Sequence, residues 1–529
     1  MSSKGWDGCL IQSTWPKTAA VRRHRAIQGR SRAMPPDDNQ QKGDVMGRPA
    51  NDPNQFYQSA LIALEDIGLQ TALDRGAVRA NVAREASMNQ TTDRARLREQ
   101  AQAARLRGLH DLPELLEQVE AHISAQGGTV LWALDADEAN RHVLDICRRH
   151  DLRRGVKAKS MVTEEIELVP FLEAHDIRMI ETDLGEYVVQ LSGDRPSHIT
   201  MPIMHHTKES VRDILMQQAG MPHADTPEQM TAFAREALRG EYIAADFGIS
   251  GGNFIIAETG HIVTVTNEGN GRLCTGLPPV HIAVVGIEKV IPTWEDFLTL
   301  YQLLCRSASG QQMSVYMNAV RSPARTDEND GPEHLYLILV DNGRSDIYGS
   351  EYAEALACIR CGACLNTCPV YQNVGGHAYG GVYPGPIGAV LTPLFKGKAN
   401  AVPLPFASSL CGACQTACPV NINIPDMLLK LRHDLQDEQE LIWQGAMTGF
   451  GYTFSHPLLY RTAGFIARTA GSVCDRTTGS VYDRTAGSGH DSIGKLPPPF
   501  DGWTESRDFP PFAAQPFRDW WKQNRERKK

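Results

Sequence analysis

The sequence predicts a layered α/β domain followed by a mainly helical domain, and three observations carry that prediction. Apolar, β-branched segments alternate with amphipathic segments over roughly residues 54–342, which is typical of a largely parallel sheet covered by helices. The alternation stops at Asn342-Gly343. Two cysteine-rich motifs then follow, with helical flanks and a Gly- and Pro-rich spacer between them. We therefore expect an α/β domain at 51–345 and a helical domain at 346–440.

The elements of the α/β domain follow from apolar periodicity. Residues 111–128 (DLPELLEQVEAHISAQGG) place their leucines on one helical face, and Gly127-Gly128 ends the helix. A hairpin turn is expected at Thr259-Gly260. Further helices are predicted at 135–150, 163–176 and 293–305. Strands are predicted at 129–134, 156–160, 177–182, 187–191 (YVVQL), 254–258, 262–266, 281–287 and 334–341.

Composition and charge exclude several classes of function. A net charge of −9 and a pI near 6.0 give no electrostatic reason to expect a nucleic-acid partner. No run of about 18 apolar residues occurs, so no transmembrane segment is predicted. The sequence contains no GxGxxG fingerprint, P-loop or nucleophile elbow, so nothing indicates a bound flavin or nicotinamide. The N-terminus has no apolar signal region, and we expect a cytoplasmic protein.

Both ends of the chain are expected to lie outside the two main domains. The basic stretch at 21–32 fits an organellar transit peptide, but we favour a disordered or over-extended N-terminus at 1–50, because Met34 and Met46 are both plausible starts. In the tail region, 441–529, a near-repeat (GSVCDRTT, GSVYDRTA) predicts a flexible loop at 471–489. The last residues combine aromatics with basic charge; we expect them to dock on their own domain, with peripheral membrane contact as the alternative.

The cysteine motifs carry the clearest chemical signal. Residues 358–370 (CIRCGACLNTCPV) match C-x2-C-x2-C-x3-C-P, the ferredoxin pattern in which the last cysteine binds the other cluster. Residues 408–420 (SSLCGACQTACPV) repeat it. Zinc is the alternative, but it prefers two separated cysteine pairs. We therefore predict two [4Fe-4S] clusters. Their expected ligands are Cys358, Cys361, Cys364 and Cys418 for cluster 1, and Cys368, Cys411 and Cys414 for cluster 2.

One of the eight expected thiolates is missing. Ser408 stands where the second motif would carry its first cysteine. We place an open or non-cysteine fourth site first, with Ser409, His377, water or a partner's residue as ligand. A three-iron [3Fe-4S] cluster comes second and the remote Cys474 third. Ligation by Ser408 comes last, because the high pKa of a hydroxyl makes it a poor substitute for a thiol.

Three segments in this order resemble the lactate-utilization protein B family: 157–168 (KAKSMVTEEIEL), the long segment at 248–296, and the cysteine motifs. The resemblance implies a LUD domain with the layered fold of the sugar-phosphate isomerase and CoA-transferase type, followed by a helical ferredoxin-type domain. It also implies electron transfer in the oxidation of L-lactate to pyruvate for growth on lactate. Companion lactate-utilization proteins and a respiratory electron acceptor are the implied partners.

Polar residues at strand ends and turns mark a candidate ligand site in the α/β domain, since such folds bind ligands there. The weak catalytic candidates are Glu258, Lys157 and Asp183. Their structural alternatives are a hydrogen-bonding role, a solvent-facing side chain and a turn brace. His205 and His206 are expected on opposite faces of a strand, with a structural role. The other members of these clusters are Lys159, Ser160, Thr182, Glu186, Asn253, Thr259, Asn267 and Glu268.

Three functions are compatible with these features. The first is an electron-transfer subunit of a complex that oxidises L-lactate. In the second, the LUD domain is itself a catalytic unit that binds a small carboxylate or phosphorylated ligand, and a lysine with a backbone nest would hold the acid group. The third is a regulatory or scaffolding subunit whose clusters sense redox state. We favour them in this order.

Overall fold

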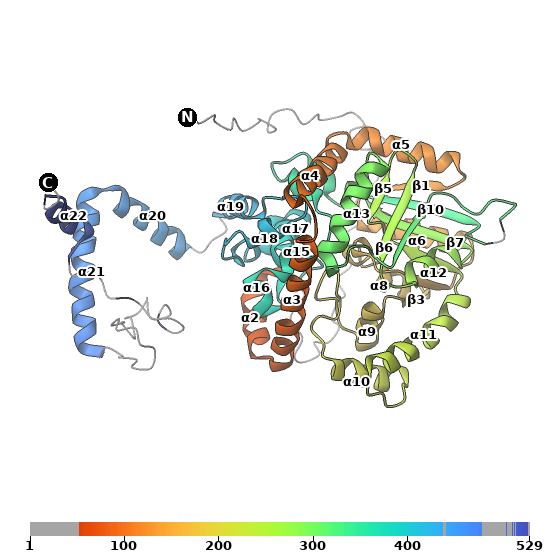
Figure 1. The fold of residues 1–529 in the computed structure, drawn as a ribbon, viewed down its shortest axis with the longest axis horizontal. Helices are drawn as coiled ribbons and strands as arrows, with labels where there is room; N and C mark the ends of the chain where they lie inside the picture. Colours follow the sequence, from red (N-terminus) through yellow and green to blue (C-terminus); the bar gives the residue numbers. More distant parts are fainter. Residues whose placement is uncertain are drawn as a thin grey trace. The chain divides into compact units, whose positions relative to one another are not determined.

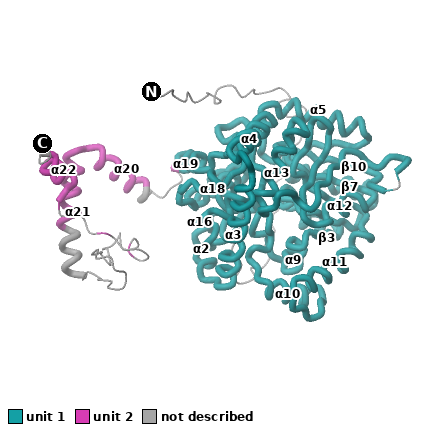
Figure 2. Tube along the Cα trace, viewed as in Figure 1, with its two compact units in different colours: residues 1–435 teal, residues 436–529 magenta. Residues whose placement is uncertain are grey.

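The computed structural model describes residues 52–328, 330–436, 441–478 and 515–526, with Thr504, Pro510 and Ala513. It divides into two compact units, residues 1–435 and 436–529, coloured separately in Figure 2. The α/β segment and the cysteine motifs belong to the same unit. The N-terminal tail predicted at 1–50 lies outside the described residues.

A six-stranded sheet forms the centre of the first unit (Figure 1). Its order is β1-β10-β7-β4-β2-β3, and every neighbouring pair is parallel. All residues of β4 and β7 are buried, as expected of central strands covered on both faces. The predicted layered α/β fold is confirmed. The strands are β1 (Thr129–Ala133), β2 (Arg154–Lys157), β3 (Arg178–Glu181), β4 (Phe247–Ser250), β7 (Val280–Gly286) and β10 (His334–Val340).

Different elements cover the two faces of this sheet. On one face, Ile282 and Val284 of β7 pack in a core with α6 (Ala136–Arg149), α7 (Met161–Glu165) and α8 (Leu168–Glu173). The alternate residues Ala283 and Val285 point to the opposite face. There they join a larger core with a second sheet and α13 (Trp294–Ser309). On this face α11 (Pro227–Ile243) and α12 (Asn270–Gly276) cover β2 and β4.

The second sheet has the order β8-β5-β6-β9. Its β5 and β6 form the predicted hairpin, with antiparallel pairing and Gly260 in the left-handed region at φ +74°. A β-carbon at Gly260 would lie 2.9 Å from the β-carbon of His122, so close approach as well as φ requires glycine. The strands are β5 (Phe254–Ile256), β6 (His261–Thr266), β8 (Val290–Ile291) and β9 (Tyr316–Val320).

Four N-terminal helices connect the α/β layers to the cysteine motifs. The buried guanidinium of Arg105 donates to the carbonyl oxygens of Leu356 and Ala357, just before the first motif, and to those of Glu288 and Val290 in the α/β domain. One continuous apolar core runs through all these parts. The N-terminal helices are α2 (Phe56–Glu65), α3 (Ile67–Met88), α4 (Arg94–His110) and α5 (Leu112–Ala125). Those of the cysteine segment are α15 (Ala363–Asn366), α16 (Pro369–Val374), α17 (Gly385–Lys396), α18 (Ala413–Ala417) and α19 (Ile424–Asp434).

Three local predictions were wrong. Residues 187–191 belong to helix α9 (Leu184–Ser192), because the Asp183 side chain caps its start and Gly193 ends it in a left-handed conformation. His205 and His206 lie in the turn before α10 (Lys208–Ala219) rather than on a strand, and their rings touch. Residues 471–478 of the predicted loop are helical.

The second unit contains α20 (Leu441–Ser455), α21 (Pro457–Thr478) and α22 (Phe517–Glu526). The predicted loop beyond residue 478 lies outside the described residues. Among the helices that the structure describes, none combines the length and apolar character needed to cross a bilayer. That result agrees with the sequence prediction.

Candidate functional site

The first cysteine motif wraps a tight loop that begins where a short 3-10 helix (Ala353–Ala357) ends. Arg360 and Gly362 both have left-handed backbones, at φ +58° and +75°. These turns direct the backbone N–H of Arg360 toward the Sγ of Cys358, 3.4 Å away. The loop then enters α15, in which Cys364 is buried. Such a loop presents closely spaced thiols to one side, as a cluster requires.

The second motif repeats this backbone although it lacks the first cysteine. Leu410 and Gly412 are left-handed at φ +54° and +80°, as are the equivalent residues of the first motif. The hydroxyl oxygen of Ser408 accepts the N–H of Leu410 at 3.1 Å, which is the counterpart of the contact between Arg360 and Cys358. The Ser408 side chain therefore takes the place that a first cysteine would take.

The thiols of the first motif lie near the last thiol of the second motif. Burial raises the pKa of Cys361, and the thiol of Cys418 is the next contributor. Burial also raises the pKa of Cys364, and the nearby thiols of Cys358, Cys361 and Cys418 are the next causes of this rise. Buried neutral thiols crowded in this way are stabilised as thiolates when iron replaces their protons. The donor set fits an iron–sulfur cluster.

A second group of thiols joins the end of the first motif to the start of the second. Burial raises the pKa of Cys414 to about 11, and the thiol of Cys368 is the next cause. Cys411 is exposed. Its pKa is lowered by hydrogen bonds from the N–H of Ala413 and the hydroxyl of Ser409. The second group of thiols therefore reaches the protein surface at Cys411.

One other residue considered as the eighth ligand, His377, can be placed in the structure. His377 lies in the loop between the motifs, and its Nε2 is 2.7 Å from the carbonyl oxygen of Arg195. Its ring also contacts His205, with the ring centroids 4.4 Å apart, so it already belongs to another group of side chains. The side chain of Cys474 lies outside the described residues.

A cavity of about 370 Å³ lies beyond the C-terminal ends of β2 and β4. Six of the predicted polar residues line it, namely Lys159, Ser160, Asp183, Asn253, Asn267 and Glu268. Its lining also includes Ile359 and Arg360, the two residues between Cys358 and Cys361. The cavity therefore adjoins the loop that carries the first thiols.

Three basic side chains line this cavity, and sequence reasoning found only Lys159. Burial lowers the pKa of Lys289 to about 7, so its amine is only partly charged near neutral pH. Lys289 and Arg360 have side chains only 7% exposed. Neither the Nζ of Lys159 nor the two terminal nitrogens of Arg360 have hydrogen-bond partners among the described residues. Their nearest anions are carboxylates of Glu186, at 3.8 Å, and Glu288, at 3.6 Å. Buried donors without partners are costly, so this wall suits an anionic ligand.

Two carboxylates that line the cavity contact the start of α9: Asp183 precedes this helix, and Glu268 lies between β6 and α12. Asp183 accepts the N–H groups of Gly185 and Glu186, so it caps the start of α9. This role agrees with the structural alternative given for Asp183, a brace for the turn. Glu268 accepts the N–H of Leu184 at 3.1 Å. Burial raises the pKa of Glu268 to about 7, and Asp183 adds to the rise. Glu268 is thus the lining carboxylate with a pKa suited to exchanging a proton near neutral pH.

Lys157 lies outside the cavity lining, and the expectation that it faces water was wrong. Its buried Nζ donates to Glu181 at 2.8 Å and to Glu164 at 3.0 Å, with Glu186 at 3.6 Å. Burial alone would lower its pKa, but the three carboxylates outweigh burial and raise the pKa well above its usual value. Beside it, buried Thr182 donates to the Lys157 carbonyl oxygen. In this group one ammonium is shared by three carboxyls, and burial raises the pKa of Glu181 and of Glu186.

Glu258 also lies away from the cavity lining. Its side chain is exposed at the β5–β6 turn, and Oε2 accepts the N–H of Trp294 at 3.1 Å. Thr259 accepts a hydrogen bond from the indole N–H of Trp294. These contacts fit the structural alternative, in which Glu258 holds the start of α13.

A buried ion network ties the cavity wall to the α/β core. Arg344 binds Glu165 through two nitrogens, at 2.8 and 2.9 Å, and Glu288 through Nε at 2.6 Å. The hydroxyl of Tyr383 donates to Glu165, and the guanidinium of Arg360 lies 4.6 Å from the Tyr383 ring centroid. The network positions Arg360, and with it the first cysteine loop, against the cavity.

Comparisons with known proteins agree with an α/β domain that is followed by a segment with two cysteine motifs. Residues 116–340 match the LUD domain, residues 354–422 the 4Fe-4S dicluster domain, and residues 434–526 the C-terminal domain of lactate utilisation protein B. The chain is 42% identical over 425 residues to lactate utilization protein B of Shouchella clausii, which covers 80% of this chain and 87% of that protein.

A second such protein, from Bacillus pumilus, is 40% identical over 467 residues, covering 88% of this chain and 96% of the other. Among solved structures, a DUF162 family protein from Deinococcus radiodurans matches with 16% identity and a TM-score of 0.23, covering 43% of this chain and 98% of that one.

Proposed function

Because the chain belongs to the lactate utilization protein B family, we propose that it transfers electrons in the oxidation of L-lactate to pyruvate. The proposal starts from a role in lactate utilization and from the presence of a 4Fe-4S domain. The proposal adds the reaction, the companion lactate-utilization proteins that act with this chain, and a respiratory acceptor that receives the electrons. Oxidation of one lactate releases two electrons and two protons.

The proposed cofactors are two clusters with crossed ligands. Cys358, Cys361, Cys364 and Cys418 would hold cluster 1, while Cys368, Cys411 and Cys414 would hold cluster 2. The electrostatic proximity of Cys418 to Cys361, and of Cys368 to Cys414, supports this crossing. When bound, each cluster supplies a one-electron site. The exposed Cys411 makes the second site the natural exit toward an acceptor.

The fourth position of cluster 2 is proposed to be non-cysteine and to face Ser408. The hydroxyl of Ser408 contacts Leu410 as the thiol of Cys358 contacts Arg360, so no rearrangement of this loop is needed to bring its oxygen to that position. This placement moves Ser408 ahead of His377, whose Nε2 already contacts a carbonyl oxygen.

The observation that carries the proposal is that one cavity is shared by the α/β domain and the first cysteine loop. Ile359 and Arg360 line the cavity and also separate two proposed ligands of cluster 1. We propose that Lys159, Lys289 and Arg360 bind the carboxylate of the hydroxy acid, for which a guanidinium offers paired donors. Glu268 would accept the hydroxyl proton, and Asp183 would hold the start of α9. The cavity favours a direct role of the LUD domain in substrate binding, which was the second of the three functions.

The cofactor assignment is tested by anaerobic purification with iron and sulfide counting, followed by electron paramagnetic resonance of oxidised and dithionite-reduced samples. About eight irons, with interacting signals only after reduction, support two cubane clusters. About seven irons, with a signal already in the oxidised sample, replace cluster 2 by a three-iron cluster. About four irons or fewer contradict the two-cluster relay, and the redox-sensing regulatory function then becomes the better account.

A further inference from the structure

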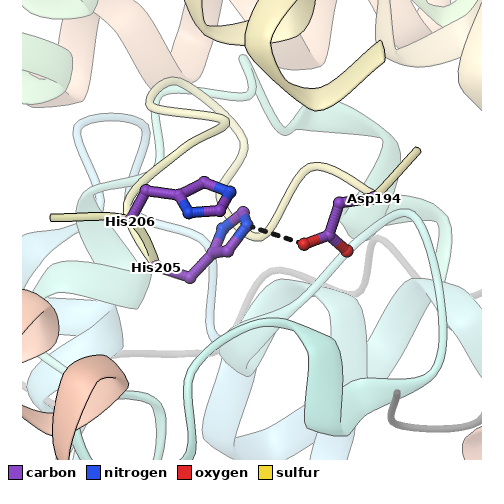
Figure 3. Close-up of side chains that lie close together, drawn as sticks. All are labelled: Asp194, His205 and His206. Atoms are coloured by element: carbon purple, nitrogen blue, oxygen red, sulfur yellow. Dashed lines mark hydrogen bonds and ion pairs between the residues drawn. The ribbon is translucent and has the colours of Figure 1, made fainter. Parts of the chain in front are cut away.

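A group of imidazole and carboxylate side chains lies outside both the cavity lining and the cysteine motifs, between α9 and α10 (Figure 3). Asp194 directly follows Gly193, which ends α9. His205 and His206 lie in the turn that leads into α10. One candidate ligand atom from each of the three residues lies within 4.8 Å of the other two. Figure 3 shows the two rings close together, and their centroids are 4.1 Å apart.

The distances within this group suit a shared metal ion. Nε2 of His205 lies 3.2 Å from Oδ2 of Asp194. With zinc–ligand bonds of about 2.0–2.2 Å, two ligand atoms of a tetrahedral site lie roughly 3.3 Å apart. The His205 side chain is 8% exposed and that of Asp194 is 27% exposed. The group is therefore mostly shielded but remains open to solvent on the side of Asp194.

One ring nitrogen in the group, Nε2 of His206, is buried and has no hydrogen-bond partner among the described residues. A buried polar atom without a partner costs free energy, and such atoms in native proteins usually have an unseen water or ion as partner. A hydrogen bond between His205 and Asp194 explains the positions of those two side chains, but it gives the buried Nε2 of His206 no partner.

The other nitrogen of each ring is held by a serine hydroxyl. Nδ1 of His205 lies 2.7 Å from Oγ of Ser197, and Nδ1 of His206 lies 2.8 Å from Oγ of Ser210. Histidines that bind metals almost always make such a second bond, which fixes the orientation of the ring. Because the serines contact the Nδ1 atoms, the Nε2 atoms of both rings remain available to bind a metal ion together with Asp194.

We propose that Asp194, His205 and His206 bind one divalent transition-metal ion. The ligand atoms would be a carboxylate oxygen and the two Nε2 atoms, with solvent at the remaining positions. Two imidazoles and one carboxylate suit Zn²⁺ in a tetrahedral site and Fe²⁺ in an open one. The shared chemistry is a borderline divalent cation, and metal analysis separates the two ions.

The site would brace the LUD domain against the loop between the cysteine motifs. The ring of His377, from that loop, lies 4.4 Å from the ring of His205. The hydroxyl of Tyr371 donates to the carbonyl oxygen of Ser197 at 2.7 Å. A β-carbon on Gly376 would lie 1.8 Å from that same oxygen, so the two segments pack as closely as glycine allows. An ion at this point would hold residues 194–206 in the conformation that this contact requires.

The test is metal analysis of the full chain, purified anaerobically and equilibrated by dialysis against buffered Zn²⁺. Zinc, iron and sulfide are counted in the same sample. The wild type is expected to hold about one Zn²⁺ per chain, the single tetrahedral site that the three ligands form. His206→Gln and Asp194→Asn are expected to lose it while iron and sulfide stay unchanged. Ser210→Ala, which removes only the supporting bond, is expected to weaken zinc binding roughly tenfold or more.

His150→Gln is the matched control, because the ring of His150 also lies against that of a second histidine, His334, but contacts a tyrosine hydroxyl instead of a carboxylate. It should retain the zinc of the wild type. Iron in excess of sulfide that disappears in His206→Gln would assign the same site to Fe²⁺. No bound metal in the wild type, or equal binding by the wild type and both ligand variants, would overturn the proposal.

Discussion

Replacing Glu268 by glutamine is expected to stabilise the protein above neutral pH while removing the proposed proton acceptor. Oε2 of Glu268 accepts the N–H of Leu184 at 3.1 Å, a role that an amide oxygen keeps. Burial, with a smaller contribution from Asp183, raises the pKa of Glu268 from 4.5 to about 7. The wild type therefore contains a carboxylate whose ionisation opposes folding.

The sign and size of the effect follow from proton linkage. Below pH 4.5 the carboxyl is protonated in the folded and unfolded chains, so its contribution to stability is fully present. As pH rises through about 7, the unfolded chain has already ionised, and that contribution is lost. The loss is about 3 kcal/mol, at about 1.4 kcal/mol for each pH unit. Glu268→Gln does not ionise and should keep that stability at pH 8.

The assay is thermal unfolding of the wild type and Glu268→Gln under anaerobic conditions, without lactate, at pH 5 and pH 8. We expect nearly equal melting temperatures at pH 5 and a gain of a few degrees for the variant at pH 8. Glu258→Gln is the matched control, because Glu258 also accepts one N–H at a helix start but is exposed. A gain that is independent of pH, or an equal gain in the control, would refute the reasoning.

Three further predictions concern the cations and the missing ligand. Lys159→Met should slow lactate-dependent reduction of the clusters at least tenfold, because it removes a charge-assisted hydrogen bond of about 1.5–3 kcal/mol. The iron content should stay unchanged, and the control Glu258→Gln should reduce its clusters at the wild-type rate. Arg344→Met removes the buried cation that binds both Glu165 and Glu288, so it should lower the unfolding free energy by about 3–5 kcal/mol, measured by denaturant unfolding. Ser408→Cys completes the second motif and should slow the loss of iron in air, followed by timed iron counts; an unchanged rate would remove Ser408 from the second site.

The fold could be predicted where apolar runs are long and have clear ends. The strand β7 is buried at every residue, and apart from His281 its sequence is an apolar run, which a central strand or a buried helix explains. Residues 187–191 misled because Tyr187, Val188 and Val189 are aromatic or β-branched and fit a strand by propensity alone. The cap by Asp183 and the left-handed Gly193 decided in favour of a helix. These end signals outweigh propensity in so short a segment.

The site could be predicted only in part, because several of its residues meet through tertiary contacts. Lys289 and Arg360 come from separate segments, and nothing local in the sequence marks them as lining one cavity. Glu258 ends a predicted strand as the true lining residues do, but at a turn away from the cavity lining. His205 and His206 were predicted on a strand, although Pro202, at the start of the turn that holds them, is a local signal against a strand. The motif cysteines, by contrast, are marked by fixed local spacing.

The most direct test of the account is to mix the anaerobically purified chain with the proposed companion lactate-utilization proteins and add L-lactate without any other reductant. The account predicts that reduced-cluster signals appear in electron paramagnetic resonance and that pyruvate forms in proportion, whereas added pyruvate alone gives no signal. Clusters that dithionite reduces but L-lactate leaves oxidised, while the mixture still forms pyruvate, would contradict the proposed electron transfer through this chain.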